Sequence, residues 1–252
     1  MELSLIWMYL GFLLAAYSVV ANDSIQTLGT FLSSNKAYFA WYTLWFAASL
    51  MMVFTITYGW YFYDGDISFG RLTRIPFQEV QWYHAMAPAV LLLLTRVGIP
   101  VSTTFLVLSA FATFTVLEKM LIKSMVGYGV AAIAAYLIWV VLERYINEKQ
   151  DHPEHIKFWR VSQWITSGWL WFAWLQHDMA NIAVFLPRKL MMGDLLMVLV
   201  STVLLLGYVF YSGGGKIQEV VISKHGTRFA RSSTIINIVY AFILFFFKEL
   251  ND

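Results

Sequence analysis

The sequence predicts an all-α, polytopic integral membrane protein, and its composition carries that prediction. Of the 252 residues, 60% are hydrophobic and only 13% are charged, whereas soluble domains carry about 25% charged residues. Aromatic residues reach 18%, and Trp and Tyr collect where a bilayer meets water. The formal net charge of +2 is too small to indicate a nucleic-acid partner, and the absence of cysteine excludes thiol chemistry. We expect a lipid bilayer as the surroundings, in the plasma (inner) membrane of a bacterium.

Hydrophobic segments along the chain are the candidate membrane helices, because about 20 apolar residues cross the hydrocarbon core. Pro100 lacks an amide donor and separates two short segments, which predicts a broken helix of the transporter type. Glu143–Arg160 and Gly213–Arg231 read as polar loops, and the Lys and Arg residues of the second predict a cytoplasmic position. The candidate spans are Leu3–Val20, Ala37–Tyr61, Ala85–Val97, Val101–Val116, Met125–Leu142, Val161–Leu175, Leu190–Tyr211 and Thr234–Phe247.

Two short polar motifs occupy corresponding places in the two halves of the chain, which indicates an internal repeat. The first, "NDSIQTLGT", holds Asp23 followed three residues later by Gln26. The second, "HDMANIAVF", holds Asp178 followed three residues later by Asn181. Each motif follows an aromatic-rich hydrophobic segment and precedes small or apolar residues. This common placement predicts that the two aspartates belong to one paired site.

The two aspartates are candidate cation ligands. A carboxylate at the bilayer centre costs about 2.5–3.5 kcal/mol on insertion scales, and two neighbouring carboxylates need a proton or a cation between them. Carboxylate, amide and hydroxyl oxygens suit hard cations such as Na⁺. The opposite interpretation, in which both aspartates cap helices or lie in surface loops, stays open at this point. The candidate cation ligands are Asn22, Asp23, Gln26, Thr27, Asp178 and Asn181, with Na⁺ expected at Asp23 and Asp178.

The stretch "PVSTT", residues 100–104, is a candidate anion site. Hydroxyls and free amide groups at a helix N-terminus favour negative charge. The plain alternative is an ordinary N-cap, because Ser and Thr are common at that position. The candidate anion ligands are Thr30, Ser102, Thr103 and Thr104.

Three further polar residues are candidate accessory groups, each with a plain alternative. Arg96 lies in an apolar run, where it either attracts an aspartate or an anion, or extends to the membrane interface. His177 is either a proton site or a hydrogen-bonding residue at a turn. Gln163 either satisfies unwound backbone or makes a polar contact between helices.

These stretches resemble the signatures of the inorganic phosphate transporter (PiT) family. "ANDSIQTLGT" resembles its G-A-N-D-x-x-N-x-x-G-T motif, and "QWITSGWLWFAWLQHDMANIAVF" looks like the second such motif. "GIPVSTTFLVLSAF" is similar to the G-x-P-V-S-T-T stretch, and "GGKIQEVVISKHGTRF" resembles the segment after the second motif. Gln26 and His177 stand where the family carries Asn, and Val184-Phe185 replaces a Gly-Pro pair. A second P-V-S-T-T element is not in the sequence, so the resemblance is to a short member lacking the C-terminal part of the second repeat.

The resemblance implies an inverted-repeat helical bundle in which two re-entrant hairpins bring Asp23 and Asp178 together at mid-membrane. It implies a first repeat over residues 1–146 and a truncated second repeat over residues 147–252. The implied function is secondary transport of inorganic phosphate or a related oxyanion by alternating access, coupled to Na⁺ or H⁺, with no other cofactor. The implied assembly is a homodimer or a complex with a partner membrane subunit.

Two other functional classes agree less well with these residues than a transporter does. The chain could be a non-transporting membrane subunit or sensor derived from a phosphate-transporter half-site, an alternative that the missing second P-V-S-T-T element favours. An intramembrane aspartyl protease is disfavoured because the Asp-centred motifs of such enzymes are absent. We therefore expect a transporter and not an enzyme.

Overall fold

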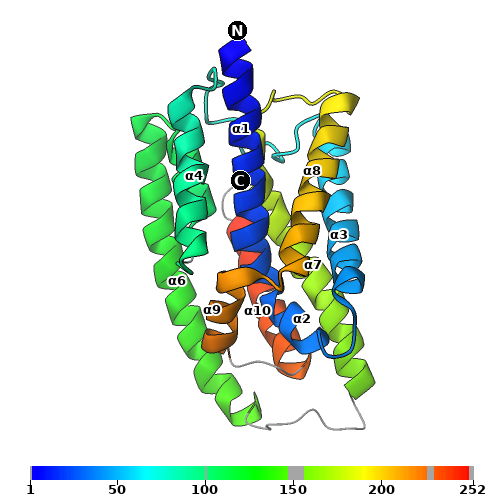
Figure 1. Ribbon diagram of the computed structural model, residues 1–252. Helices are drawn as coiled ribbons and strands as arrows, with labels where there is room; N and C mark the ends of the chain where they lie inside the picture. The colour runs from blue at the N-terminus through cyan, green and yellow to red at the C-terminus, as the bar shows by residue number, and fades with distance from the viewer. Residues whose placement is uncertain (1, 100, 147–155, 226–229, 250–252) are drawn as a thin grey trace.

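The computed structural model describes residues 2–99, 101–146, 156–225 and 230–249, and every regular element in these ranges is helical, as predicted (Figure 1). Pro100 and residues 147–155 and 226–229, which include parts of both predicted polar loops, lie outside the described residues. In chain order the helices are α1 (Glu2–Ser18), the π-helical segment η1 (Val19–Asp23), α2 (Ser24–Asn35), α3 (Trp41–Phe62), α4 (Trp82–Arg96), α5 (Thr103–Ser109), α6 (Phe114–Ile146), α7 (Ile156–Ala183), α8 (Met192–Tyr211), α9 (Gly215–His225) and α10 (Ala230–Glu249).

Three helical segments of the described chain combine membrane-spanning length with an apolar composition. Leu3–Asn35, Trp41–Phe62 and Met192–Tyr211 are long and apolar enough to cross a bilayer, judged by length and composition. Many of their large apolar side chains are exposed on the outside of the bundle, Leu13, Phe46 and Leu204 among them. Lipid is the solvent that such a surface requires. The chain therefore has the character of a helical membrane protein.

The first span differs from the sequence-based expectation at its C-terminal end. The segment was predicted to end at Val20 and to continue as a re-entrant hairpin, but helix continues through Asp23 to Asn35. The backbone N–H of Ser24 bonds to the Val19 carbonyl, which is the wider π-type turn that occurs frequently at functional sites. The polar residues remain inside the bundle because other segments of the chain supply their partners, so polarity here does not mark a chain leaving the membrane.

The predicted break near Gly98 is formed by a glycine-dependent helix end. Gly98 has φ +80°, and its N–H bonds to the Thr95 carbonyl at 3.0 Å, while the Ile99 N–H bonds to the Leu94 carbonyl at 3.0 Å. This double closure is the Schellman motif, which needs a residue that tolerates positive φ.

Helix α5 is much shorter than the predicted span Val101–Val116. It ends at Ser109, where the N–H groups of Ala110 and Phe111 bond in the tighter i→i−3 pattern. A new helix, α6, begins at Phe114 and contains the predicted span Met125–Leu142. The hydropathy of this region is continuous, so the turn between α5 and α6 has no signal in the apolar pattern.

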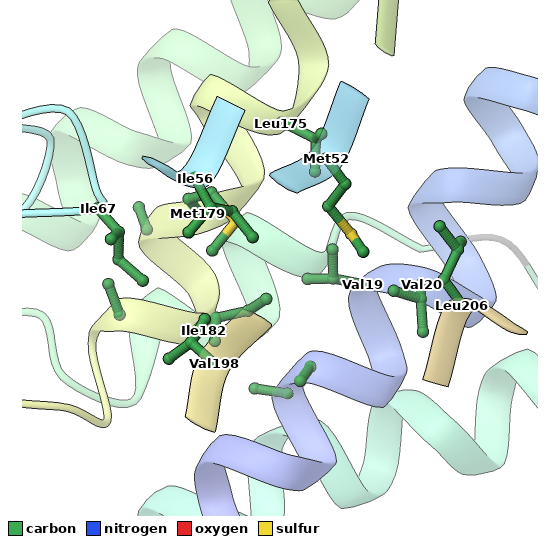
Figure 2. Packing of buried hydrophobic residues seen from close by; sticks show 14 of the residues in the cluster. Val19, Val20, Met52, Ile56, Ile67, Leu175, Met179, Ile182, Val198 and Leu206 are labelled. Atoms are coloured by element: carbon green, nitrogen blue, oxygen red, sulfur yellow. The ribbon is translucent and has the colours of Figure 1, made fainter. Parts of the chain in front are cut away.

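The core lies where α3, α7 and α8 surround the π-helical segment. Figure 2 shows Val19 and Val20 of η1 in the same cluster as Met52 of α3 and Leu206 of α8. At the centre, the fully buried Trp171 of α7 donates its indole N–H to the Ala48 carbonyl at 3.2 Å. This packing fixes α7 against α3.

Helices α2 and α7 are antiparallel neighbours. Asn35, at the end of α2, bonds to Gln163 near the start of α7. Asp23, just before α2, lies near Asp178 towards the end of α7. Helix α10 packs along α7, and α9 packs on α2, so these helices gather at the lower end of Figure 1. The two predicted motifs therefore face each other across one helix pair.

Candidate functional site

Asn22 is the residue that ties the first motif to the rest of the site. It is fully buried, and its Nδ2 donates to the Val101 carbonyl at 2.9 Å and lies 3.2 Å from Thr103 Oγ1. The same nitrogen lies 2.7 Å from Asp23 Oδ1. Its own oxygen accepts a hydrogen bond from Gln26 Nε2 at 2.9 Å. Asn22 thereby joins the π-helical segment to the start of α5.

The backbone around Asp23 is stabilised by hydroxyl side chains. Thr27 Oγ1 donates to the Asp23 carbonyl at 2.7 Å, and Ser24 Oγ donates to the Val20 carbonyl. Such side-chain bonds satisfy carbonyls that the wider π-type turn leaves poorly matched. The Asp23 side chain makes no capping bond to α2, so the interpretation of Asp23 as a helix cap is wrong.

Asp178 is placed inside α7, which extends to Ala183 and so passes beyond the predicted end at Leu175. The Trp174 side chain, one turn earlier, lies near the Asp178 carboxylate. One turn later, Asn181 Nδ2 donates to Thr104 Oγ1 at 3.1 Å. Asp178 and Asn181 are both buried, so the surface-loop interpretation of the second motif is also wrong.

Three oxygen atoms at this place have no hydrogen-bond partner. They are Asp23 Oδ2, Asp178 Oδ2 and Asn181 Oδ1, and all three are buried. The two carboxylates are close enough for their charges to interact. A buried acceptor without a donor is unfavourable by about 1–3 kcal/mol, and more when it is charged. The arrangement is acceptor-rich and donor-poor, which is the condition that a bound cation or proton relieves.

Two hydroxyl groups border the unpartnered oxygens. Thr103 Oγ1 is an acceptor for Asn22, and Thr104 Oγ1 is an acceptor for Asn181. A hydroxyl that accepts from an amide keeps its own hydrogen to donate elsewhere. The Thr103 hydroxyl lies near the Asp23 carboxylate. Thr104 Oγ1, as an acceptor, likewise keeps its own hydrogen to donate.

The two motifs and the start of α5 form one group of polar residues, which we call the aspartate cluster. The residue types of the cluster limit which metal ions it could bind. Within the described chain, no three His, Cys, Asp or Glu residues come together. Two carboxylates with amide and hydroxyl oxygens suit Na⁺ better than a transition metal. The aspartate cluster consists of Asn22, Asp23, Thr27, Thr103, Thr104, Asp178 and Asn181.

Several predicted site residues lie elsewhere. Thr30 accepts a hydrogen bond from Ser233 of α10 at 2.9 Å, one to two turns from Asp23 along α2. Ser102 is exposed and caps α5 by accepting from the Phe105 N–H at 3.3 Å. It is therefore an ordinary N-cap, the alternative to an anion ligand. Arg96 is exposed at the end of α4.

The remaining three predicted residues have mixed positions. Gln26 is exposed and reaches the cluster only through Asn22. His177 is half-buried beside Asp178. Gln163 bonds to Asn35 at 2.8 Å and to Ser34, at the far end of α2 from Asp23. Gln163 therefore makes a polar contact between α7 and α2, which is the second of the two interpretations given for it above.

Sequence reasoning missed three residues with clear roles. Trp174 lies near Asp178, and its signal was the one-turn spacing within α7. Asn35 pairs with Gln163, a partner 128 residues away along the chain that no local sequence pattern indicated. Arg71 lies within electrostatic reach of Asp178 and comes from the segment between α3 and α4, which carried no motif.

Comparisons with protein-family models, curated proteins and solved structures return no match for this chain.

Proposed function

We propose that this protein is a cation-coupled secondary transporter of inorganic phosphate or a related oxyanion, with Na⁺ as the coupling ion at Asp23 and Asp178 and H⁺ as the second candidate. The observation that carries the proposal is the convergence of both motifs on residues 101–104, with three buried oxygens left unpartnered. Helix packing alone gives no reason to bury two neighbouring carboxylates in this condition.

The cation step follows from the charge balance. Two buried carboxylates cannot both remain charged without a compensating positive charge. A Na⁺ ion accepts the two Oδ2 atoms and the Asn181 oxygen as ligands, and a proton on one carboxylate provides a donor for the other. Either cation halves the net charge of the carboxylate pair from −2 to −1, and so lowers the repulsion that an anion meets at the surface beside α5. Anion binding next to that surface then depends on the cation, which is the basis of coupled transport.

The anion step rests on the hydroxyls at the start of α5 and on the resemblance to phosphate transporters. Asn181 fixes Thr104 as an acceptor, which leaves its hydroxyl hydrogen to donate to an oxyanion. Thr103 lies beside it and is buried. Because Asn181 also carries one of the unpartnered oxygens, it contacts the proposed cation directly and the proposed anion through Thr104. This shared residue supplies a direct physical link between cation and anion.

The antiparallel run of α2 and α7 supports an inverted relation between the two halves. We accordingly extend the proposal to a repeat over residues 1–146 and 147–252, a position in a bacterial inner membrane, and alternating access around the aspartate cluster. A homodimer or a partner membrane subunit completes the proposed assembly.

The test is uptake of radiolabelled anion into proteoliposomes that contain the purified protein. Phosphate, sulfate and arsenate are compared under a Na⁺ gradient, a pH gradient and no gradient. We expect phosphate or arsenate uptake that a Na⁺ gradient drives and that the variants Asp23→Asn and Asp178→Asn reduce to the level of empty liposomes. Asp64→Asn, which removes one partner of an exposed ion pair with Lys189, is the matched control and keeps full uptake.

Two outcomes contradict the proposal. If no anion is taken up under any gradient, and the two aspartate variants leave Na⁺-dependent stability unchanged, the proposed transport function is wrong. If Na⁺ raises the stability of the wild-type protein but no anion is taken up, the non-transporting subunit or sensor becomes the better assignment.

A further inference from the structure

A cavity of about 210 Å³ lies at one end of the bundle, between α2, α3, α8 and α9, and we call it the end cavity. Its walls are mostly apolar and include Leu32 of α2, Leu44 of α3 and Phe210 of α8. At about 30 Å³ for each water molecule, this volume equals about seven waters. The end cavity therefore has room for a lipid headgroup or the first part of one acyl chain, but not for a whole lipid.

The end cavity lies where the three membrane-spanning segments of the described chain have their ends. Lys36 directly follows the first span, Trp41 begins the second and Tyr211 ends the third, and all three residues border the cavity. Membrane-spanning helices end where the hydrocarbon core meets the headgroups. In Figure 1 these ends lie in the lower half of the bundle, near α9. The end cavity is therefore at the level of the lipid headgroups.

Two aromatic side chains at the rim of the end cavity have the character of membrane-interface residues. Trp41 and Tyr211 contact each other edge to face, with ring centroids 5.4 Å apart. The two residues are 41% and 70% exposed. Trp and Tyr collect at headgroup level because each has an apolar ring and a polar group at its edge. Their exposure places the rim of the end cavity in contact with lipid.

Positive charge near the end cavity is not neutralised within the described chain. Lys36 is exposed, and no carboxylate of the described residues pairs with it. The Arg160 guanidinium lies 3.7 Å from the centre of the Tyr38 ring, two residues beyond Lys36, and it also has no carboxylate partner in the described chain. By contrast, Lys216 of α9 is paired with Glu219. Unpaired cations at headgroup level attract anionic lipids.

The buried wall of the end cavity carries a polar side chain whose hydrogen bonds are incomplete. Gln218 of α9 borders the cavity and donates from Nε2 to the Gly29 carbonyl at 2.9 Å. Its Oε1 is buried and has no hydrogen-bond partner. A hydroxyl group is a donor of the kind that this oxygen lacks, and a glycerol headgroup carries hydroxyls.

We propose that the end cavity binds the headgroup of an anionic phospholipid, with Lys36 paired to the phosphate, Gln218 at the polar base, and the start of one acyl chain against the apolar wall. The occupant is a lipid, because an apolar wall at the ends of three spans suits an acyl chain and offers a free anion no ligand. This inference does not depend on the proposed transport function, since it uses no residue of the aspartate cluster.

The test is native mass spectrometry of the purified protein in detergent, titrated with phosphatidylglycerol or with phosphatidylcholine of the same acyl chains. We expect the wild-type protein to bind phosphatidylglycerol more tightly than phosphatidylcholine. Lys36→Gln should raise the dissociation constant for phosphatidylglycerol about fivefold and leave that for phosphatidylcholine unchanged. Lys36→Arg keeps the charge and should match the wild type.

Two further variants separate the end cavity from the general charge of this end of the bundle. Lys157→Gln is the matched control, because Lys157 is an exposed lysine at the start of α7 that does not border the cavity. It should leave the binding of both lipids unchanged. Leu32→Phe keeps every charge and narrows the cavity, so it should weaken the binding of both lipids. A melting curve for each variant shows that the fold is kept.

Four outcomes would overturn the inference. Equal dissociation constants for the two lipids in the wild-type protein would show that it does not select anionic lipid. A loss in Lys157→Gln as large as that in Lys36→Gln, or no loss in Leu32→Phe, would show that the lipid is attracted by surface charge and not held in the end cavity. If an excess of inorganic phosphate removes the bound phosphatidylglycerol, the site takes a free anion and the lipid assignment is wrong.

Discussion

Two buried polar clusters lie at opposite ends of the same helix pair, α2 and α7, and they differ in whether their hydrogen bonds are complete. In the aspartate cluster, three oxygens have no partner. At the other end, an amide cluster joins Ser34, Asn35, Gln163 and Trp164, and each side chain is paired: Asn35 bonds Gln163 at 2.8 Å and accepts from Trp164 at 3.1 Å.

The difference teaches how a binding site can be told from a structural contact in a membrane bundle. A fully paired polar network holds two helices together and has no capacity left for a ligand. An incomplete network of acceptors retains free energy that a cation can recover on binding. On this basis the amide cluster determines stability, and the aspartate cluster determines ion affinity. Substitutions in the two clusters should therefore change different measured quantities.

The largest effect on folding is expected from Gln163→Leu. This change removes the buried hydrogen bonds of Gln163 to Asn35 and to Ser34, and should lower the free energy of unfolding by about 2 kcal/mol. Unfolding in detergent, followed by circular dichroism, measures it, with Asp64→Asn as the control. The double variant Asn35→Leu/Gln163→Leu should recover part of the loss, because both polar groups are then absent. A change in Na⁺ affinity with unchanged stability would contradict this assignment of the amide cluster.

A smaller effect, on ion affinity, is expected from Asn181→Ala. The substitution removes one of the unpartnered oxygens and the bond to Thr104. We expect the half-saturation concentration for Na⁺ in uptake to rise about tenfold, while the free energy of unfolding falls by no more than about 1 kcal/mol. Equal affinities in the variant and the wild type would show that the Asn181 oxygen is not a cation ligand.

The smallest effect is expected from Thr104→Val, which keeps the volume and removes the hydroxyl. The half-saturation concentration for phosphate should rise about fivefold, or about 1 kcal/mol, because one neutral hydrogen-bond donor is lost. Thr104→Ser keeps the hydroxyl and should restore the wild-type value. If Thr104→Val shifts the Na⁺ dependence alone, Thr104 acts on the cation side and not on the anion.

The helical class and the pairing of Asp23 with Asp178 could be predicted from the sequence for distinct reasons. Composition alone restricts a chain of this kind to apolar helices, since a bilayer leaves no water to satisfy exposed backbone groups. The repeated Asp and amide spacing indicated that the two motifs belong to one site, and the structure brings them into electrostatic contact. The repeat was informative because a carboxylate followed three residues later by an amide occurs in both halves of the chain.

The continuous helix through Asp23 could not be predicted in the same way. Hydropathy treats a polar stretch as the end of a span, yet Asn22 and Thr27 find their partners within the bundle. Thr27 bonds the carbonyl one turn before it, but the Asn22 partners Val101 and Thr103 lie 79 and 81 residues away along the chain. The same reason explains Thr30, which was assigned to the anion site but bonds Ser233 of α10. Long-range pairing decides the positions of Asn22 and Thr30.

The central claim, that the aspartate cluster binds Na⁺, is tested most directly by equilibrium binding of radiolabelled Na⁺ to the purified protein. The wild-type protein and the Asp64→Asn control should show saturable binding that excess unlabelled Na⁺ displaces and choline does not. Asp178→Asn should show no saturable binding while it keeps the wild-type circular dichroism spectrum. Saturable binding of equal affinity in Asp178→Asn and in the wild-type protein would contradict the claim.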